Sequence, residues 1–274
     1  MKILIADKLS AKAISNLEEL GATVTFNPDL DADDLSNAID NANILIVRST
    51  KVYAKTIIAG KSLELIIRAG SGTNNIDLES ASDNGIYVAN CPGKNSDAVA
   101  ELTLGHIIAC DRRIVDASLD LRDGIWKKKT YQKADGLKGR TLGIIGMGAI
   151  GSALAKLAKV LNMRVIAWSR NLTPEKANKL GVIYCRSIIE VASDADVVSV
   201  HLAMRSGTKH LLDSNFFNKM KDGAIFVNTS RGEIVDTISL RTAIEQKSLR
   251  VGLDVFENEP NSGLAEFEQI DLAS

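Results

Sequence analysis

The chain has 274 residues, of which 45% are hydrophobic and 24% charged, and this length leads us to expect two domains. Its formal net charge is −1, so we expect no binding to nucleic acid or anionic membrane by bulk electrostatics. Three widely spaced cysteines without a CxxC pair exclude a disulfide framework and a zinc site, and no metal is expected. No apolar run approaches the roughly 18 residues of a membrane span and the first ten residues are unlike a signal peptide, which favours a cytoplasmic protein.

The first 95 residues alternate short apolar runs with helical stretches. Residues 10–21, for example, predict a helix with Ser10 as its N-cap and Gly21 at its end. The apolar runs are β-branched and nearly continuous, as strands buried on both faces of a parallel sheet are. The predicted strands are residues 2–7, 22–27, 43–49, 63–70 and 86–90.

A long helical stretch at residues 95–114 leads into a second series of the same kind. Before that series lies WKKKTYQK (126–133), which mixes basic and aromatic residues as nucleic-acid patches do, but it is short and isolated, so a solvated connector or a subunit contact fits better. The further predicted strands are residues 141–146, 163–169, 182–185, 196–202, 224–230 and 250–256. The sequence therefore predicts an α/β protein with two parallel-sheet units joined by one long helix.

The segment GIIGMGAIG opens the second series with the spacing GxGxxG. We expect Gly146 to allow the tight turn from strand to helix, Gly148 to let the backbone approach a pyrophosphate, and Gly151 to let the helix pack closely on the strand. The first helical residues, Ala149 and Ile150, present free N–H groups at the positive end of the helix dipole. Because the motif follows a predicted strand and precedes a predicted helix, it predicts a dinucleotide-binding site.

The next predicted strand ends in VIAWSR, where an acid would hold the adenosine ribose of NAD. Ser169 and Arg170 stand there instead. Without the carboxylate, a 2′-phosphate is no longer repelled, and the Arg170 guanidinium can bind one. Alternatively, Arg170 is exposed to solvent and Ser169 still allows NAD to bind. The sequence therefore leaves both NAD and NADP open as the cofactor.

Several separated motifs together resemble the D-isomer-specific 2-hydroxyacid dehydrogenase family over essentially the whole chain. Within that family, LIVRSTKV (45–52) and NCPGKN look most like the D-3-phosphoglycerate dehydrogenases. The other motifs, in the expected order around the glycine fingerprint, are RAGSGTNNID (68–77), VANCPGKNSDAVAELTLG (88–105), HLAMRSGTKHLLD (201–213), NTSRGEIVD (228–236) and GLDVFENEP (252–260).

The resemblance implies two Rossmann-like, doubly wound domains. Residues 1–95 would form a flavodoxin-like substrate-binding domain and residues 96–274 an NAD(P)-binding Rossmann domain, with a homodimer formed through the latter. It also implies transfer of a hydride between the nicotinamide and C2 of a D-2-hydroxy acid or 2-keto acid.

The resemblance also assigns site residues. Arg231 matches the catalytic arginine, whose planar fork can hold the substrate carboxylate and polarise the carbonyl. Asp254 matches a residue that contacts the nicotinamide amide, although a strand-end aspartate can also cap a helix. His201 and Thr229 match positions beside the cofactor. The loop whose N–H groups bind the substrate carboxylate corresponds to Ala69, Gly70, Ser71 and Gly72.

Glu259 matches the acid that orients the family's catalytic histidine and raises its pKa, but no histidine follows it. His106 lies in the long helical stretch, and His201 and His210 flank the loop after a different strand. We therefore expect a truncated form, without the last strand of the nucleotide domain and the return segment of the first domain, in which Glu259 has no imidazole to orient.

The substrate stays open within the family. Arg48 and Lys51 follow a strand of the first domain and can meet a second anionic group, which favours 3-phosphoglycerate and 3-phosphohydroxypyruvate and thus serine biosynthesis. The departure at VIAWSR favours a glyoxylate or hydroxypyruvate reductase instead. A corepressor-like protein that binds the cofactor without turnover is a third possibility, which the presence of both Arg231 and Glu259 disfavours.

Overall fold

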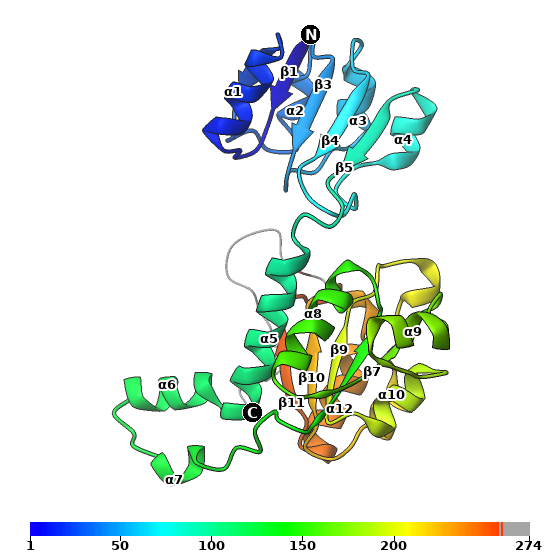
Figure 1. Ribbon diagram of the computed structural model, residues 1–274. Helices are drawn as coiled ribbons and strands as arrows, with labels where there is room; N and C mark the ends of the chain where they lie inside the picture. Colours follow the sequence, from blue (N-terminus) through cyan, green and yellow to red (C-terminus); the bar gives the residue numbers. More distant parts are fainter. Residues whose placement is uncertain (258, 260–274) are drawn as a thin grey trace. The chain divides into compact units, whose positions relative to one another are not determined.

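The computed structural model describes residues 1–257 and residue 259. The chain divides into two compact units, residues 1–95 (unit 1) and residues 96–274 (unit 2). Each unit is built on its own parallel sheet (Figure 1). The predicted α/β fold class with two parallel-sheet domains is confirmed.

The sheet of unit 1 has the strand order β2-β1-β3-β4-β5, and all its neighbouring strands are parallel. This is the flavodoxin-like doubly wound order, whose topological switch point lies between β1 and β3. Loops that follow the carboxyl ends of these two strands are therefore the ones that diverge to leave a crevice. The strands are β1 (Lys2–Ile5), β2 (Thr23–Phe26), β3 (Ile44–Val47), β4 (Leu65–Arg68) and β5 (Tyr87–Asn90).

Alternate residues of the central strands point to opposite faces of this sheet, and each face has its own core. Ile3, Ile5 and Ile46 pack with apolar residues of α1 (Ala11–Glu19) on one face. Leu4 and Leu45 belong to the core on the other face. That second face is covered by α2 (Leu35–Ala38), α3 (Ala54–Ala59) and α4 (Leu78–Asp83).

The first helix begins and ends close to where the sequence predicts. The Ser10 hydroxyl accepts a hydrogen bond from the Ala13 N–H at 3.3 Å, which makes Ser10 the N-cap of α1. Beyond the C-cap Leu20, Gly21 has φ +85°, a conformation in which glycine carries no steric penalty.

The described part of unit 2 has a six-stranded sheet in the order β11-β10-β9-β6-β7-β8, again with parallel neighbours. Counted from its first strand, this is the Rossmann order 3-2-1-4-5-6, with the switch point between β6 and β9. The strands are β6 (Thr141–Ile145), β7 (Arg164–Trp168), β8 (Ile183–Tyr184), β9 (Val197–Val200), β10 (Ile225–Asn228) and β11 (Arg250–Leu253).

Helices cover both faces of this sheet. One core contains apolar residues of α5 (Ser96–Arg112), α8 (Ala149–Val160) and α9 (Pro174–Leu180). The other contains residues of α10 (Ile188–Asp194), α11 (Ser214–Lys219) and α12 (Thr237–Lys247). None of the described helices combines the length and the apolar character that a membrane crossing requires.

A two-helix arm extends from the end of α5, where the sequence analysis expected a connector. Arg113, at φ +52°, turns the chain from α5 into α6 (Ile114–Arg122), and α7 (Lys128–Tyr131) follows (Figure 1). Within the arm, the Asp120 carboxylate accepts hydrogen bonds from the Tyr131 hydroxyl and from Lys127 Nζ, which lower the pKa of Asp120. The tract WKKKTYQK is thus partly helical, and part of it holds the arm together.

A buried ion pair joins the end of α5 to the start of the sheet. The Asp111 side chain is 1% exposed, and its Oδ1 lies 3.0 Å from Arg140 Nη1. Its Oδ2 accepts the Gly136 N–H at 3.1 Å. Arg250, at the start of β11, donates to the Asp111 carbonyl oxygen at 3.4 Å. One aspartate therefore holds α5, the loop before β6 and β11 at the same end of unit 2.

Candidate functional site

The three glycines of the fingerprint have different surroundings. Gly146 follows β6 at φ +108°, and a Cβ there would overlap the His201 carbonyl oxygen. A Cβ at Gly151 would overlap the Gly146 carbonyl oxygen. At Gly148, which caps α8, no atom lies within 4 Å of the position that a Cβ would take. Packing of the protein itself therefore accounts for Gly146 and Gly151, whereas Gly148 borders open space.

The amino end of α8 is suited to a phosphate. No side chain caps it, and the N–H groups of Ala149 and Ile150 in its first turn have no acceptor among the described residues. Together with the open space at Gly148, these N–H groups form a cradle for an anion at the positive end of the helix dipole.

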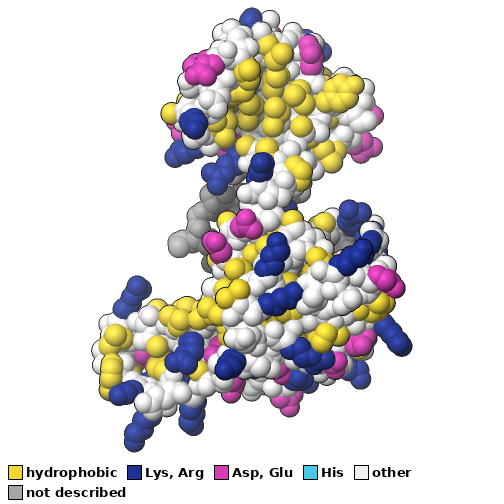
Figure 2. All heavy atoms as spheres, in the orientation of Figure 1, with side chains coloured by type: hydrophobic (Ala, Val, Ile, Leu, Met, Phe, Trp, Pro, Cys, Tyr) yellow, Lys and Arg dark blue, Asp and Glu magenta, His cyan; other side chains and the backbone are white. Residues whose placement is uncertain are grey.

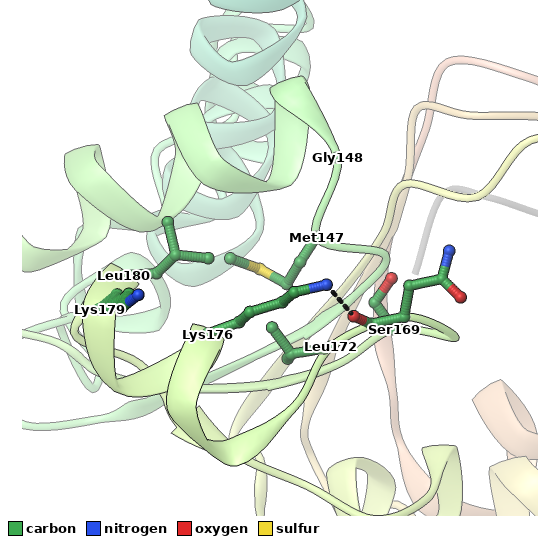
Figure 3. Close-up of a pocket in the computed structure, with 8 residues that line it drawn as sticks. Met147, Gly148, Ser169, Leu172, Lys176, Lys179 and Leu180 are labelled. Atoms are coloured by element: carbon green, nitrogen blue, oxygen red, sulfur yellow. Dashed lines mark hydrogen bonds between the residues drawn. The ribbon is translucent and has the colours of Figure 1, made fainter.

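An open pocket of about 560 Å³ lies beside this cradle (Figure 3). No carboxylate is among the described residues that line it. Ser169 of the predicted cofactor site is in its wall, but its neighbour Arg170 is exposed and not part of the lining. The lining residues are Met147, Gly148, Ser169, Asn171, Leu172, Lys176, Lys179 and Leu180.

His201 follows β9, next to the glycine turn. Its Nε2 lies 2.9 Å from the Ser199 hydroxyl, while its buried Nδ1 has no hydrogen-bond partner among the described residues. Burial lowers the pKa of His201 to about 4, so the ring is neutral at pH 7. Within the described residues this nitrogen lacks the partner that buried polar atoms usually have, and His201 follows a strand at the carboxyl end of the sheet.

Thr229, also predicted beside the cofactor, is buried at the end of β10. Its hydroxyl lies 2.9 Å from the Thr103 hydroxyl, which in turn donates to the Val99 carbonyl at 2.7 Å. The Thr229 side chain therefore ties β10 to α5.

A buried asparagine that the sequence analysis did not single out shapes the loop that carries Arg231. Asn228, the last residue of β10, accepts hydrogen bonds from the Ser230 N–H (3.0 Å) and hydroxyl (2.7 Å) through Oδ1. Its Nδ2 donates to the Arg231 carbonyl oxygen at 2.9 Å. Arg231 Nη1 donates to the Ser230 carbonyl oxygen at 2.6 Å. The position of Asn228 two residues before a serine is the local signal for such a turn.

The loop after β11 packs directly on the Arg231 loop. A Cβ at Gly232 would overlap the backbone of Phe256, so the two loops touch at a position where only glycine fits. Asp254 is exposed, and its N–H donates to the Asn228 carbonyl oxygen at 3.1 Å. Glu259 is also exposed and accepts the Phe256 N–H at 2.9 Å. Residues 258 and 260–274, which include the end of the GLDVFENEP motif, lie outside the described residues.

A second contact, which was not predicted, holds this loop. His210 Nε2 lies 2.6 Å from Glu257 Oε1, and the Thr237 hydroxyl donates to Glu257 Oε2 at 2.9 Å. His210 itself has φ +48°. The loops after β9 and β11 are thus connected by an ion pair when His210 is protonated.

In unit 1, an acid at the end of β1 organises the segment with the predicted phosphate-binding residues. Asp7 Oδ2 accepts the N–H groups of Arg48, Ser49 and Thr50 at 2.7, 3.1 and 3.0 Å. Arg48 and Lys51 are exposed beyond this turn. This role of Asp7 was not predicted, because Asp7 and Arg48 follow two strands, β1 and β3, that are adjacent in the sheet but distant in sequence.

The predicted carboxylate-binding turn follows β4. Within it, the N–H groups of Ala69 and Gly70 donate to the Val47 and Arg68 carbonyl oxygens. The N–H groups of Ser71 and Gly72 have no acceptor among the described residues. The Arg68 side chain packs over this turn, since a Cβ at Gly70 would overlap its guanidinium group. The structure therefore leaves two of the four predicted N–H donors to a ligand.

Comparison with known proteins shows the family of this chain. Residues 104–272 match the family described as D-isomer specific 2-hydroxyacid dehydrogenase, NAD binding domain. The chain belongs to this family. The match falls within unit 2, which is accordingly the NAD-binding domain, and the family resemblance predicted from the sequence is confirmed.

Similarity extends beyond that domain. The chain is 39% identical to hydroxypyruvate reductase of Thermotoga maritima over 93% of this chain and 81% of that protein. It is 38% identical to D-3-phosphoglycerate dehydrogenase of Methanocaldococcus jannaschii over 95% of this chain, and spans about half (50%) of that relative's length. The crystal structure of the TT0316 protein from Thermus thermophilus superposes with a TM-score of 0.85 at 35% identity, covering 95% of this chain and 83% of that one.

The described residues fit the dinucleotide that the family implies. The cradle at Gly148 and the uncapped α8 suit the pyrophosphate, and the unpartnered His201 Nδ1 offers a hydrogen bond at the same sheet edge. These features stand on two separate segments, the start of α8 and the loop after β9, so they come together only in the folded unit.

Proposed function

We propose that this chain is part of an NAD(P)-dependent oxidoreductase that interconverts a D-2-hydroxy acid and the corresponding 2-keto acid. One observation carries the proposal. An open, uncapped phosphate cradle at Gly148 and an arginine on a buried-asparagine turn, Arg231, follow β6 and β10 of one parallel sheet, and so share its carboxyl edge.

The residues would act as follows. Gly148, with the N–H groups of Ala149 and Ile150, holds the pyrophosphate, and Asp254 and His201 contact the nicotinamide half. When bound, the nicotinamide would supply or accept the hydride at C2, while a proton moves on or off the 2-oxygen. Arg231 binds the substrate carboxylate and polarises the 2-oxygen through its fork of N–H donors. In unit 1, the N–H groups of Ser71 and Gly72, which have no acceptor among the described residues, are the proposed donors to a carboxylate.

For the substrate we propose a phosphorylated acid, 3-phosphoglycerate or 3-phosphohydroxypyruvate, as in serine biosynthesis. The support is the turn on Asp7, which presents Arg48 and Lys51 together at the carboxyl edge of the unit 1 sheet. Replacing both cations by Ala should raise KM for 3-phosphohydroxypyruvate much more than for hydroxypyruvate. An equal rise for both substrates would contradict a phosphate-binding role.

An unphosphorylated keto acid is the second candidate. It is supported by Ser169 and Arg170 in place of the ribose-binding acid and by the similarity to a hydroxypyruvate reductase. Steady-state assays of the protein with 3-phosphohydroxypyruvate, hydroxypyruvate and glyoxylate, each with NADH and NADPH, decide between the two. Tight cofactor binding without turnover of any of these acids would refute the dehydrogenase and favour a cofactor-binding protein that works through partners.

The proposed role of Arg231 can be tested separately. Arg231→Lys keeps the charge but loses the planar fork, so kcat/KM should fall by about 100-fold or more while NADH binding is retained. A parallel loss of NADH affinity would instead place Arg231 in the cofactor site.

We further propose a cytoplasmic homodimer formed through unit 2. The support is the arm of α6 and α7, whose apolar side chains are exposed between basic ones (Figure 2). Several large apolar residues on one projecting segment are typical of a subunit interface. They are Ile114, Val115, Leu119, Leu121, Ile125 and Trp126.

A further inference from the structure

We infer that the pocket beside Gly148 is a binding site for the 2′-phosphate of NADP, and that Lys176 is the residue that selects this cofactor over NAD. The inference rests on the proposed NAD(P)-dependent function and adds the cofactor preference to it. Its evidence is the placement, charge and support of Lys176.

The pocket lies where the adenosine ribose of a dinucleotide would end. In a Rossmann fold the pyrophosphate sits at the glycine turn and the ribose hydroxyls reach the end of the next strand, here β7. Ser169 directly follows β7 and lines the pocket together with Gly148 of the glycine turn. From there the pocket continues to α9, so space remains beyond the ribose on the side of its 2′-oxygen.

That space is positively charged. Lys176 and Lys179 both line it, and no carboxylate is among its described lining residues. In the described part of the chain neither lysine forms a salt bridge. Met147 and the buried Leu172 give the pocket an apolar wall, which reduces solvent screening of the charge. An anionic group is therefore favoured there over the neutral 2′-hydroxyl of NAD.

Lys176 is held in place over the pocket. Its side chain reaches from α9 to the loop after β7 (Figure 3), where Nζ donates to the Asn171 carbonyl oxygen at 3.2 Å. An ammonium group has three N–H donors, so two remain for phosphate oxygens. The backbone at Lys176 is fixed as well, because its N–H donates to the hydroxyl of the N-cap Thr173 at 3.3 Å and Pro174 begins the helix.

Arg170, which the sequence analysis proposed for this role, differs in position. It is adjacent to Ser169 in sequence, but it is exposed and does not line the pocket. The structure thus separates two cations that local sequence cannot rank, and assigns the phosphate to Lys176.

The test compares two nucleotides that differ only in the 2′-phosphate, adenosine 2′,5′-bisphosphate and 5′-AMP, by calorimetric titration of the whole chain. The wild type should bind the bisphosphate at least about 10-fold more tightly. Lys176→Ala should lower the affinity for the bisphosphate by about 10- to 100-fold, the range for losing a charge-assisted contact, and leave 5′-AMP unchanged. Lys176→Arg should restore most of this preference. Lys219→Ala, an exposed lysine of α11 on the opposite face, is the matched control and should bind both nucleotides as the wild type does.

Equal binding of the two nucleotides by the wild type would overturn the inference, and so would a loss in Lys176→Ala that is equal for both. A larger selective loss in Arg170→Ala than in Lys176→Ala would return the role to Arg170 and overturn it too. In these cases 5′-AMP and NADH would still bind, so the proposed function would stand. If neither nucleotide, NADH nor NADPH binds the folded chain, the proposed function fails as well.

Discussion

At the scale of single residues, the three glycines of the GxGxxG motif have different roles. Gly146 and Gly151 are required by contacts inside the protein, because a methyl group at either would overlap a backbone oxygen. Gly148 is not required by any such contact. Its absent side chain matters only when something occupies the space beside it. A side chain at Gly146 or Gly151 should therefore reduce stability, whereas a side chain at Gly148 should reduce ligand binding.

Gly148→Ala should leave the free energy of unfolding within about 0.5 kcal/mol of wild type, because the site has no packing contacts. The same substitution should weaken NADH binding at least about 10-fold, because the methyl group enters the space beside the turn. Gly151→Ala should reduce the free energy of unfolding by about 1 to 3 kcal/mol, since the helix must move away from the turn. Urea denaturation and NADH fluorescence titration measure the two effects. If Gly148→Ala were as destabilising as Gly151→Ala, the space beside it would not be open in solution.

The buried imidazole of His201 links stability to pH. Its pKa is lowered to about 4 in the fold and is about 6.5 in an unfolded chain, so between these values only the unfolded chain binds the proton. The stability that neutral His201 contributes is complete above pH 6.5 and is lost as the pH falls toward 4. From pH 7.5 to 4.5 we expect His201 to account for a loss of about 2 to 3 kcal/mol.

His201→Asn removes this titration without removing the carboxylates that also respond to acid. Urea unfolding at the two pH values should show a smaller loss for the variant than for wild type, by about 2 to 3 kcal/mol. Identical losses would mean that the ring is solvated, or is protonated in the folded protein.

At the scale of helices and strands, the end of unit 2 opposite the site depends on Asp111. It pairs with Arg140 and accepts the Gly136 N–H, while its carbonyl accepts from Arg250. These contacts hold α5 against β11 and against the loop that leads into β6. The carboxylate is almost completely buried, so no water can replace a lost partner.

Asp111→Ala should lower the free energy of unfolding by about 1 to 3 kcal/mol, because Arg140 loses its closer carboxylate and keeps only Asp135 at 3.8 Å, and the Gly136 N–H loses its acceptor. Glu101→Gln, on an exposed position of the same helix, should change it by less than about 0.5 kcal/mol. Chemical denaturation followed by circular dichroism measures both. A cost for Asp111→Ala that is no larger than for the control would show that the pair contributes little in solution.

At the scale of the whole molecule, the arm of α6 and α7 contributes few apolar residues to the described core and exposes many. A stable interface buries about 800 Å² on each partner, usually around a cluster of aromatic and aliphatic side chains. Trp126 is 76% exposed and Leu121 is 59% exposed on this arm. Such residues are costly in water unless a second chain covers them.

Sedimentation equilibrium should therefore give the mass of a dimer, and Leu121→Asp with Trp126→Asp should give a monomer that still binds NADH. Lys138→Ala, an exposed position outside both arm helices, should remain a dimer. A dimer that persists in the double variant would place the interface elsewhere, and a wild-type monomer would refute the proposed assembly.

The sequence alone was sufficient for the fold class and for the strand–turn–helix at GxGxxG. Strands such as residues 141–146 are visible because a buried parallel strand is apolar at nearly every position, and GxGxxG is visible because its backbone constraints act over a few consecutive residues. Ser10 as the N-cap of α1 was predictable for the same reason, since a cap and its helix are contiguous in the chain. The helical arm was missed, because its apolar residues face outward and give no core-facing period.

Only the tertiary structure decided which side chains meet at the carboxyl edges of the two sheets. Asp7 with the Arg48 turn and His210 with Glu257 pair across loops that follow different strands, and the order of strands in a sheet is not encoded in any one segment. The direction of a loop side chain is likewise set by what packs beneath it. For that reason Arg170, beside Ser169 in sequence, is exposed and does not line the pocket, whereas Lys176, in the first turn of α9, does.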